Sequence, residues 1–329
     1  MRAVLPVVVA LVALAAAGAG AARDPGPLRG SPLGHTGLRL VVAAKPPIVV
    51  DVDTGRSTRL RGATVPGRRP LSVTAVGGRA AVVFAYTGSQ AAKLWSVTGH
   101  TRLSALGRGS DVVADGRTVW VKSGCTLRHL SLAGRRLGPD RAIACRATLT
   151  AASPAGLVVS RVRLIDPRTG RTLLRTRWGV TAAAGTKLVL AGPGDSLTLH
   201  DVATGAERRL RRPASIGTLQ GESVDPSGRY VTLAAGNPAW HGGGSQVVDL
   251  WVLDTKTARL THLPGTPAFV SLKFTSTTWT DDGRLVLLAQ VDNRDVVALW
   301  RPGQRHLALK PLRLPPRDSA GSDTFAVLR

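Results

Sequence analysis

The sequence is poor in cysteine, methionine and aromatic residues. It has two cysteines and one methionine in 329 residues, and aromatic residues make up 4% of the chain. Two cysteines cannot build the dense disulfide framework of a small secreted domain. The chain also has no zinc signature, no phosphate-binding glycine loop, no dinucleotide fingerprint and no D-x-D-x-D-G calcium run. We therefore expect neither a cofactor nor a metal.

Acidic residues are scarce as well. There are 20 Asp and Glu against 44 Lys and Arg, which gives a formal net charge of +24. Such a field attracts acidic polymers. A composition bias that places arginine on solvated outer strands explains the same excess, and we favour it because arginines occur over the whole chain, singly or in pairs such as Arg208 and Arg209. The candidate partners are an acidic envelope polymer or a protein, and nucleic acid is not expected.

Long apolar runs are confined to the first 22 residues. One cation, Arg2, precedes AVLPVVVALVALAAAGAGAA, and the small residues Ala19 to Ala21 form an A-x-A site before Ala22. This is the pattern of a cleaved signal peptide over residues 1–22, followed by a polar leader over 23–35. An uncleaved anchor is the alternative, because about 20 apolar residues can span a bilayer. We expect a secreted or cell-envelope protein with no transmembrane segment after cleavage.

A hairpin turn recurs along the rest of the chain at intervals of roughly 35 to 50 residues. Each copy follows a short apolar strand and precedes a basic outer strand. Its final glycine suits the left-handed position of a short hairpin loop. The copies are DVDTG at 51–55, SVTG at 96–99, SLAG at 131–134, DPRTG at 166–170, DVATG at 201–205, LDTKT at 253–257 and RPG at 301–303.

A second glycine turn lies upstream of most copies, so each unit reads as four antiparallel strands. The most complete unit spans 218–263, and the first unit lacks its inner strand. SDTFAVLR at 322–329 can supply that strand and leave no free sheet edge between the first and last units. The sequence therefore predicts an all-β fold over residues 36–329, a seven-bladed β-propeller of four-stranded antiparallel blades, closed by the C-terminal strand and monomeric.

The order of these motifs resembles a known repeat family. A DPSG turn at 225–228, a buried strand, the LWVLD strand and the following D-x-x-T-type turn are similar to the WD40-like β-propeller repeats of the TolB and YVTN type. The WD dipeptide of true WD40 repeats is absent, so that family's hydrogen-bond network is not carried over. The resemblance implies the fold and the turn chemistry, and it implies no catalytic residue.

Four of the seven tryptophans recur in one place. We assign Trp95, Trp120, Trp251 and Trp300 to the strand before the outer hairpin turn, where repetition indicates core packing between blades. GDSL at 194–197, with His200 close by, matches the nucleophile signature of a hydrolase family. Here it falls inside a hairpin of the fifth unit, and we assign it no catalytic role.

The two cysteines are predicted to form a disulfide. Cys125 lies in the middle hairpin of the third unit, and Cys145 lies in the link to the fourth. In a propeller those two connections lie on the same face. Export brings the two thiols into an oxidising compartment, where disulfides form and persist. Two buried thiols are the alternative.

The sixth middle hairpin is the candidate binding site. It is stretched to GNPAWHGGGSQ at 236–246, a composition that neither packs a core nor makes a tight turn. Flexible polar insertions on rigid scaffolds often carry function. We expect Trp240, His241 and Asn237 to line a pocket with Arg211 and Arg212 nearby, although a neutral insertion is equally consistent with this composition.

Two functional hypotheses follow from the fold. The first is a secreted binding or recognition scaffold for a cell-envelope component or a partner protein. The second is a propeller enzyme, such as a lactonase, lyase or glycan hydrolase, with its site on the central axis. The two differ in whether carboxylates or histidines from several blades converge on that axis.

Overall fold

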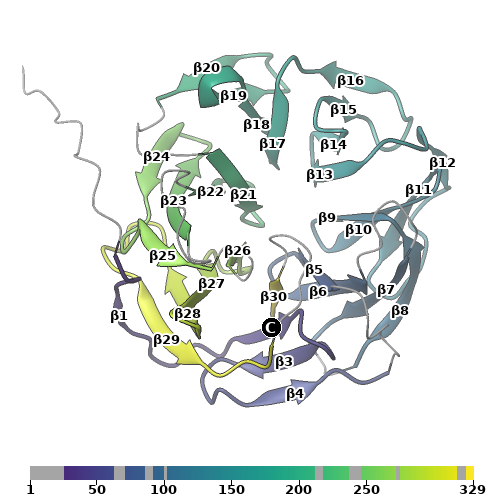
Figure 1. Ribbon diagram of the computed structural model, residues 1–329. Coiled ribbons are helices and arrows are strands. Elements are labelled where there is room, and N and C mark those ends of the chain that lie inside the picture. Colours follow the sequence, from purple (N-terminus) through teal and green to yellow (C-terminus); the bar gives the residue numbers. More distant parts are fainter. Residues whose placement is uncertain are drawn as a thin grey trace, which may run out of the picture.

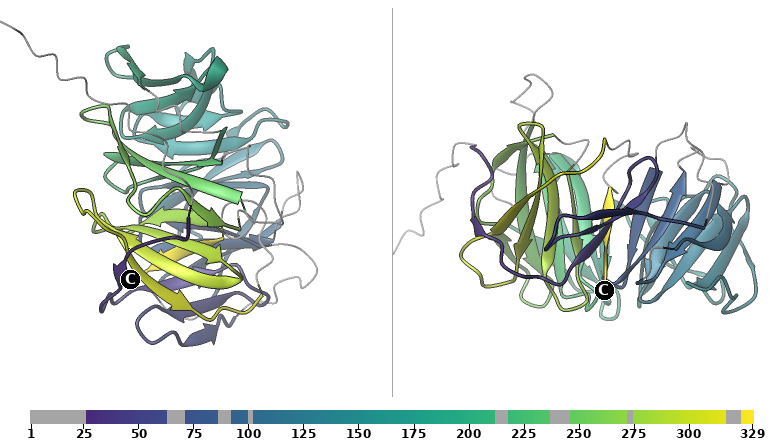
Figure 2. Two further views of the ribbon diagram at one scale, coloured as in Figure 1. Left: turned by 60° about the vertical axis from the view of Figure 1, so that its left-hand side comes forward. Right: turned by 90° about the horizontal axis from the view of Figure 1, so that it is seen from below.

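Seven small antiparallel sheets stand around a common axis in the computed structural model (Figure 1). The second view in Figure 2 shows the same ring from the side. The structure describes residues 26–62, 71–85, 92–99, 102–211, 218–236, 246–271, 275–316 and 324–329. The prediction of a seven-bladed β-propeller is confirmed.

The blades are numbered in chain order, and their strands run from the axis outwards. Blade 1 consists of β30 (Phe325–Leu328), β2 (Arg39–Val42), β3 (Ile48–Asp51) and β4 (Ser57–Arg59). Blade 2 consists of β5 (Leu71–Val76), β6 (Ala80–Ala85), β7 (Ala92–Val97) and β8 (Ser104–Gly109). Blade 3 consists of β9 (Asp111–Asp115), β10 (Thr118–Ser123), β11 (Thr126–Ser131) and β12 (Arg141–Ala142). Blade 4 consists of β13 (Leu149–Ser153), β14 (Gly156–Val159), β15 (Arg163–Ile165) and β16 (Thr172–Arg175).

The last three blades include two that carry an extra strand. Blade 5 consists of β17 (Gly179–Ala184), β18 (Lys187–Ala191), β19 (Leu197–Asp201) and β20 (Glu207–Leu210), with the 3-10 helix η1 (Pro193–Asp195) in its middle hairpin. Blade 6 consists of β21 (Thr218–Val224), β22 (Tyr230–Gly236), β23 (Gln246–Asp254) and β24 (Arg259–His262), with β25 (Ala268–Val270) also paired to β23. Blade 7 consists of β26 (Ser276–Trp279), β27 (Leu285–Val291), β28 (Arg294–Trp300), β29 (Ala308–Leu312) and β1 (Ser31–Pro32).

The C-terminal strand closes the ring. β30 pairs antiparallel with β2, with Leu40 opposite Val327 and Val42 opposite Phe325. It also lies beside the inner strands of both neighbouring blades, β5 and β26. The strand that the first unit lacks is therefore supplied from the far end of the chain, as predicted.

A hydrophobic cluster fills each of the seven boundaries between adjacent blades. The cause is the two-residue period of a strand, which sends alternate side chains to opposite faces of the blade. In β30, Phe325 and Val327 pack toward blade 7, whereas Ala326 and Leu328 pack toward blade 2. Because every blade is apolar on both faces, the strands read as nearly continuous apolar runs.

Part of the segment expected as a polar leader is paired with the ring. β1 runs parallel to β29, with Ser31 opposite Ala308, and Gly26 forms a bridge with Ala268 of β25. Residues 1–25, which include the predicted signal peptide, lie outside the described residues. In the part of the chain that is described, no helix has the length and apolar character of a membrane span.

The ring has two faces, which differ in the loops they carry. We call the side with the middle hairpins and the links between blades the connector face. The other side, with the glycine-containing turns between first and second and between third and fourth strands, is the turn face. Since the strands of each blade alternate in direction, this division follows from the antiparallel order.

Candidate functional site

A cavity of about 430 Å³ lies on the axis of the ring. The inner strands of the blades line it together with their first turns, which include Gly77, Gly116, Gly185 and Gly228. Because those turns belong to the turn face, the cavity reaches that face rather than the connector face. Hydroxyl and small apolar side chains dominate its wall, and no Lys, Arg or His is among the described residues that line it.

Three consecutive inner strands carry a bulge. The register shifts between Leu149 and Ala151 in β13, between Val180 and Ala182 in β17, and between Leu219 and Gly221 in β21. A bulge places an extra residue in the strand and re-aims its side chain. The extra residue of β13, Thr150, lines the axial cavity. That of β17, Thr181, donates its hydroxyl to the carbonyl of Val189 at 3.1 Å.

Among the described residues that line the axial cavity are two carboxylates, Asp115 and Asp225, and each is held by its own blade. Asp225 accepts hydrogen bonds from the amides of Ser227 and Tyr230, at 3.1 and 2.5 Å, and from the Ser227 hydroxyl. Asp115 Oδ2 accepts the indole N–H of Trp120 at 3.0 Å. Asp225 therefore holds the first turn of blade 6 in place, and Asp115 orients the Trp120 ring.

Asp115 of blade 3 forms a cluster with Thr118, Trp120 and His129. The Trp120 and His129 rings are stacked with centroids 4.2 Å apart. The Thr118 hydroxyl donates to the carbonyl of Asp115 at 2.8 Å, so it accepts from His129 Nε2, 2.7 Å away. Burial lowers the pKa of His129, with Asp115 opposing, and the neutral ring fits this arrangement.

The position of Trp120 corrects the sequence interpretation. Trp95, Trp251 and Trp300 lie in third strands, as expected, but Trp120 lies in β10, the second strand of its blade. It still packs into the core between blades 3 and 4. The assignment of Trp120 to the third strand was wrong because blade 3 carries its tryptophan on β10. The third strand carries His129, which stacks on it.

Blade 6 builds a similar cluster from Asp249, Trp251, His262 and Thr266. Asp249 accepts the indole N–H of Trp251 at 2.9 Å and lies 2.6 Å from His262 Nε2. The Thr266 hydroxyl donates to the carbonyl of Leu263 at 2.8 Å. In a catalytic triad the acid and the nucleophile contact different imidazole nitrogens. Here Asp249 Oδ1 and the Thr266 hydroxyl lie 2.6 and 3.3 Å from the same nitrogen, Nε2, so the cluster differs from a triad and holds the link after β24 in place.

The GDSL motif forms no catalytic pair. Ser196 directly precedes β19 and His200 lies within it, four residues later, about 13 Å along an extended chain. His200 is buried and pairs with Glu207 of the neighbouring strand at 3.1 Å. The sequence interpretation that this motif is structural agrees with that geometry.

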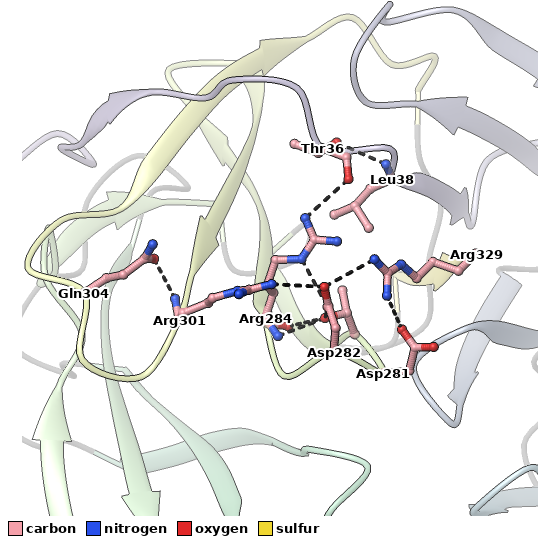
Figure 3. Close-up of polar contacts among 9 residues, drawn as sticks. Thr36, Leu38, Asp281, Asp282, Arg284, Arg301, Gln304 and Arg329 are labelled. Carbon is pink, nitrogen blue, oxygen red and sulfur yellow. Dashed lines mark hydrogen bonds and ion pairs between the residues drawn. The ribbon is translucent and has the colours of Figure 1, made fainter.

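The densest charged cluster of the described residues lies on the turn face, where the ring closes (Figure 3). The first turn of blade 7 contributes Asp281 and Asp282. Arg329 binds both, at 2.7 and 3.2 Å, and Arg284 and Arg301 each approach Asp282 to 3.1 Å. Burial raises the pKa of Asp282, but hydrogen bonds from Thr280 and Arg284 outweigh it and the net shift is downward. The network bridges the gap left where blade 1 has no covalent first turn.

Aspartates of the recurring turns bind the backbone of their own turn. Asp51 Oδ1 accepts the amide of Thr54 at 2.8 Å, and Asp166 Oδ1 accepts that of Arg168 at 2.8 Å. These hydrogen bonds hold the pKa of both carboxyls below the ordinary value. The described residues contain no group of three or more potential metal ligands. Both aspartate side chains therefore stabilise their own turns.

The predicted disulfide is present between Cys125 and Cys145. It joins the middle hairpin of blade 3 to the link into blade 4, on the connector face. Buried Lys122 donates to the carbonyl of Cys145 at 2.9 Å, which fixes the same link. Asp111 lies opposite Lys122 in β9, and burial raises the pKa of its carboxyl.

Most of the predicted binding residues lie outside the described residues. These are Asn237, Trp240, His241 and Arg212. Arg211 is described, is exposed and directly follows β20. The prediction of a pocket on the connector face therefore remains a prediction.

Arg211 lines a second depression, of about 480 Å³, at the outer wall of the ring between blades 5 and 6. Arg208 of β20 and Arg259 of β24 line it too, with Thr257, Ala258 and Leu260. Sequence reasoning missed this grouping. A signal was present, since ERRLRR and ARLTHL are the outer strands of consecutive blades, and such strands stand next to each other in a propeller.

Ala258, which lines the same depression, has a left-handed backbone conformation where the matching turn of blade 5 has glycine. The last turn residue is Gly205 in blade 5, with φ of 73°, but Ala258 in blade 6, with φ of 54°. A left-handed conformation costs a residue with a Cβ about 1–2 kcal/mol. A Cβ added at Gly205 meets no atom within 4 Å, so a change there reports the backbone cost alone.

We expect Gly205→Ala to lower the free energy of unfolding by about 1 kcal/mol. Ala258→Gly is expected to raise it by less than about 1 kcal/mol, because relief of strain is partly offset by the entropy of glycine in the unfolded chain. Urea denaturation of the two variants measures both values. Shifts of the same sign in both variants would contradict this account of the turn.

No protein-family model and no curated protein sequence matches the chain. Among solved structures, a putative 6-phosphogluconolactonase from Bacteroides uniformis is 13% identical, with a TM-score of 0.52 over 89% of this chain and 100% of that one. The fold is a seven-bladed β-propeller. A chain of the mitotic checkpoint complex is 16% identical, with a TM-score of 0.49 over 92% of this chain and 97% of that one. The Neurospora crassa Pan2 WD40 domain is 9% identical, with a TM-score of 0.46 over 88% of this chain and 100% of that one. At these identities the β-propeller fold is what the comparison shows, and no activity follows from it.

Proposed function

We propose that this β-propeller is an exported binding scaffold that recognises a cell-envelope component or a partner protein. The observation that carries the proposal is the composition of the axial cavity. Both of its carboxylates are bound by their own blades, and its remaining polar groups are mainly hydroxyls such as Thr150. Such a wall can hydrogen-bond a ligand but offers no free acid and base pair across the axis.

Export is part of the same proposal. Its support is the apolar run at 1–22 with its A-x-A site, together with the disulfide between Cys125 and Cys145. Disulfides persist in oxidising compartments and are rare in the cytosol. A propeller outside the cytosol meets polysaccharides, envelope proteins and secreted partners.

The test is binding of the mature chain, residues 23–329, to purified envelope polysaccharides and envelope proteins. One variant, Trp240→Ala/His241→Ala, truncates the two side chains that are predicted to bind on the connector face. A second variant, Thr150→Tyr, fills the axial cavity. We expect a ligand whose affinity falls at least about tenfold in one of the two, as for loss of an interface hot spot.

The outcome also separates the two faces and the two function classes. Loss of affinity in Thr150→Tyr alone places the site in the axial cavity and contradicts the connector-face prediction. Turnover of a lactone or glycan that Asp115→Asn or Asp225→Asn abolishes would contradict the scaffold proposal and establish an enzyme.

A further inference from the structure

We propose that the depression lined by Arg208, Arg211 and Arg259 binds the anionic groups of an acidic polysaccharide. The inference rests on the proposed function, since it names the class of ligand and the residues of one binding site. Nothing in it depends on the axial cavity or on the loop at 237–245.

Three arginines from two blades line the depression. Arg208 shares a face of β20 with Leu210, because strand side chains alternate, and Leu210 is buried in the core between blades 5 and 6. Arg208 therefore lies on the side of β20 that faces blade 6. Arg259 is the first residue of β24, the outer strand of that blade. The depression therefore exists only because one blade packs against the next.

These positive charges are not neutralised within the described structure. No described carboxylate makes an ion pair with Arg208, Arg211 or Arg259. The two acids nearest in sequence are already bound elsewhere, Glu207 to His200 at 3.1 Å and Asp254 to Arg229 at 2.9 Å. Three neighbouring cations repel one another, so an incoming anion relieves that repulsion.

The chemistry of the wall suits a sugar acid. A guanidinium group presents a planar fork that binds carboxylate, sulfate or phosphate through two parallel hydrogen bonds. Between the arginines lie the partly buried side chains of Ala258 and Leu260 and the exposed Thr257. An apolar floor beside a hydroxyl can accept the face and the edge of a pyranose ring while the arginines hold its charge.

The surroundings favour a polymer over a single small anion. The depression is on the outer wall of the ring, and further exposed cations lie near it on this wall. Arg209 and Lys256 lie next to it, and Arg171 and Arg175 stand on the outer edge of blade 4. A chain with repeated charges can follow such a row, and each contact releases counter-ions.

The test compares two triple variants with equal loss of charge. The site variant is Arg208→Gln/Arg211→Gln/Arg259→Gln. The control variant is Arg56→Gln/Arg59→Gln/Arg305→Gln, in which two positions are on or beside β4, across the ring from β20 in Figure 1. All six arginines are exposed, so both variants should fold, and circular dichroism melting curves verify this. The probes are a sulfated heparin oligosaccharide, polygalacturonate, neutral dextran and a DNA oligonucleotide of matched charge.

We expect the wild type to bind an acidic polysaccharide and not dextran. The site variant should weaken that binding at least about a hundredfold. It should also reduce the slope of log affinity against log salt concentration by about two to three. The control variant should change the affinity less than about threefold. An equal loss in both variants, or DNA binding as tight as polysaccharide binding and equally sensitive to the site variant, overturns the inference. No binding to either acidic polysaccharide also overturns it, and leaves the scaffold proposal to its own test with other envelope components.

Discussion

Deletion of residues 323–329 is expected to abolish cooperative folding of the ring. The deletion removes β30, in which Phe325, Ala326, Val327 and Leu328 are all at most 3% exposed. Burial of one large apolar side chain contributes about 1.5–3 kcal/mol, so the loss exceeds about 5 kcal/mol before hydrogen bonds are counted. A domain has only about 5–15 kcal/mol of total stability. Thermal unfolding followed by circular dichroism measures the effect.

Two controls separate the strand from the charge network at its end. Arg329→Gln removes the ion pairs to Asp281 and Asp282 but keeps β30, and partly exposed pairs of this kind contribute about 1 kcal/mol or less. Adding the peptide SDTFAVLR to the truncated chain should restore part of the melting transition. A truncated chain that melts like the wild type would show that the ring closes in another way.

Loss of the disulfide is expected to lower the free energy of unfolding by about 3 kcal/mol. The bridge joins residues 20 apart in sequence and restricts the unfolded chain between Cys125 and Cys145. The variant Cys125→Ser/Cys145→Ser should therefore unfold at a lower guanidinium concentration than the wild type, with an equal or steeper denaturant slope because its unfolded chain is less restricted.

Reduction provides the matched control. The wild type in reductant should unfold at nearly the same midpoint as the double serine variant. Thiol titration of the denatured, unreduced wild type should find no free thiol. Two reactive thiols in that titration would contradict the disulfide.

The tryptophans show where spacing from a turn assigns the strand correctly and where it does not. Trp95, Trp251 and Trp300 are in third strands, as their spacing from the outer turn indicates, whereas Trp120 is in β10. Trp120 lies 11 residues before the outer turn that begins at Ser131, whereas the other three tryptophans lie one or two residues before theirs. The tight turn around Cys125 separates Trp120 from that outer turn, so the residue belongs to the strand before.

The histidine clusters show a second limit. His129 and His262 are far apart in sequence from any other histidine and give no metal or catalytic spacing. Their partners, Trp120 and Trp251, face them across strands, and the contact is visible only once the strand register is known. A pattern of Asp and Trp two to five residues apart, followed by His one strand later, is the signal that could have found them.

The sequence by itself determined the local chemistry. Glycine or an aspartate side chain at each turn, and an apolar run for each strand, fix seven four-stranded units and the pairing of β30 with the first of them. Tertiary structure decided which side chains of different blades meet. The grouping of Arg208, Arg211 and Arg259, and the capture of Asp115 and Asp225 by their own blades, depend on register and on the packing of neighbouring blades. Those contacts join residues that no local pattern connects, so only the folded ring brings them together.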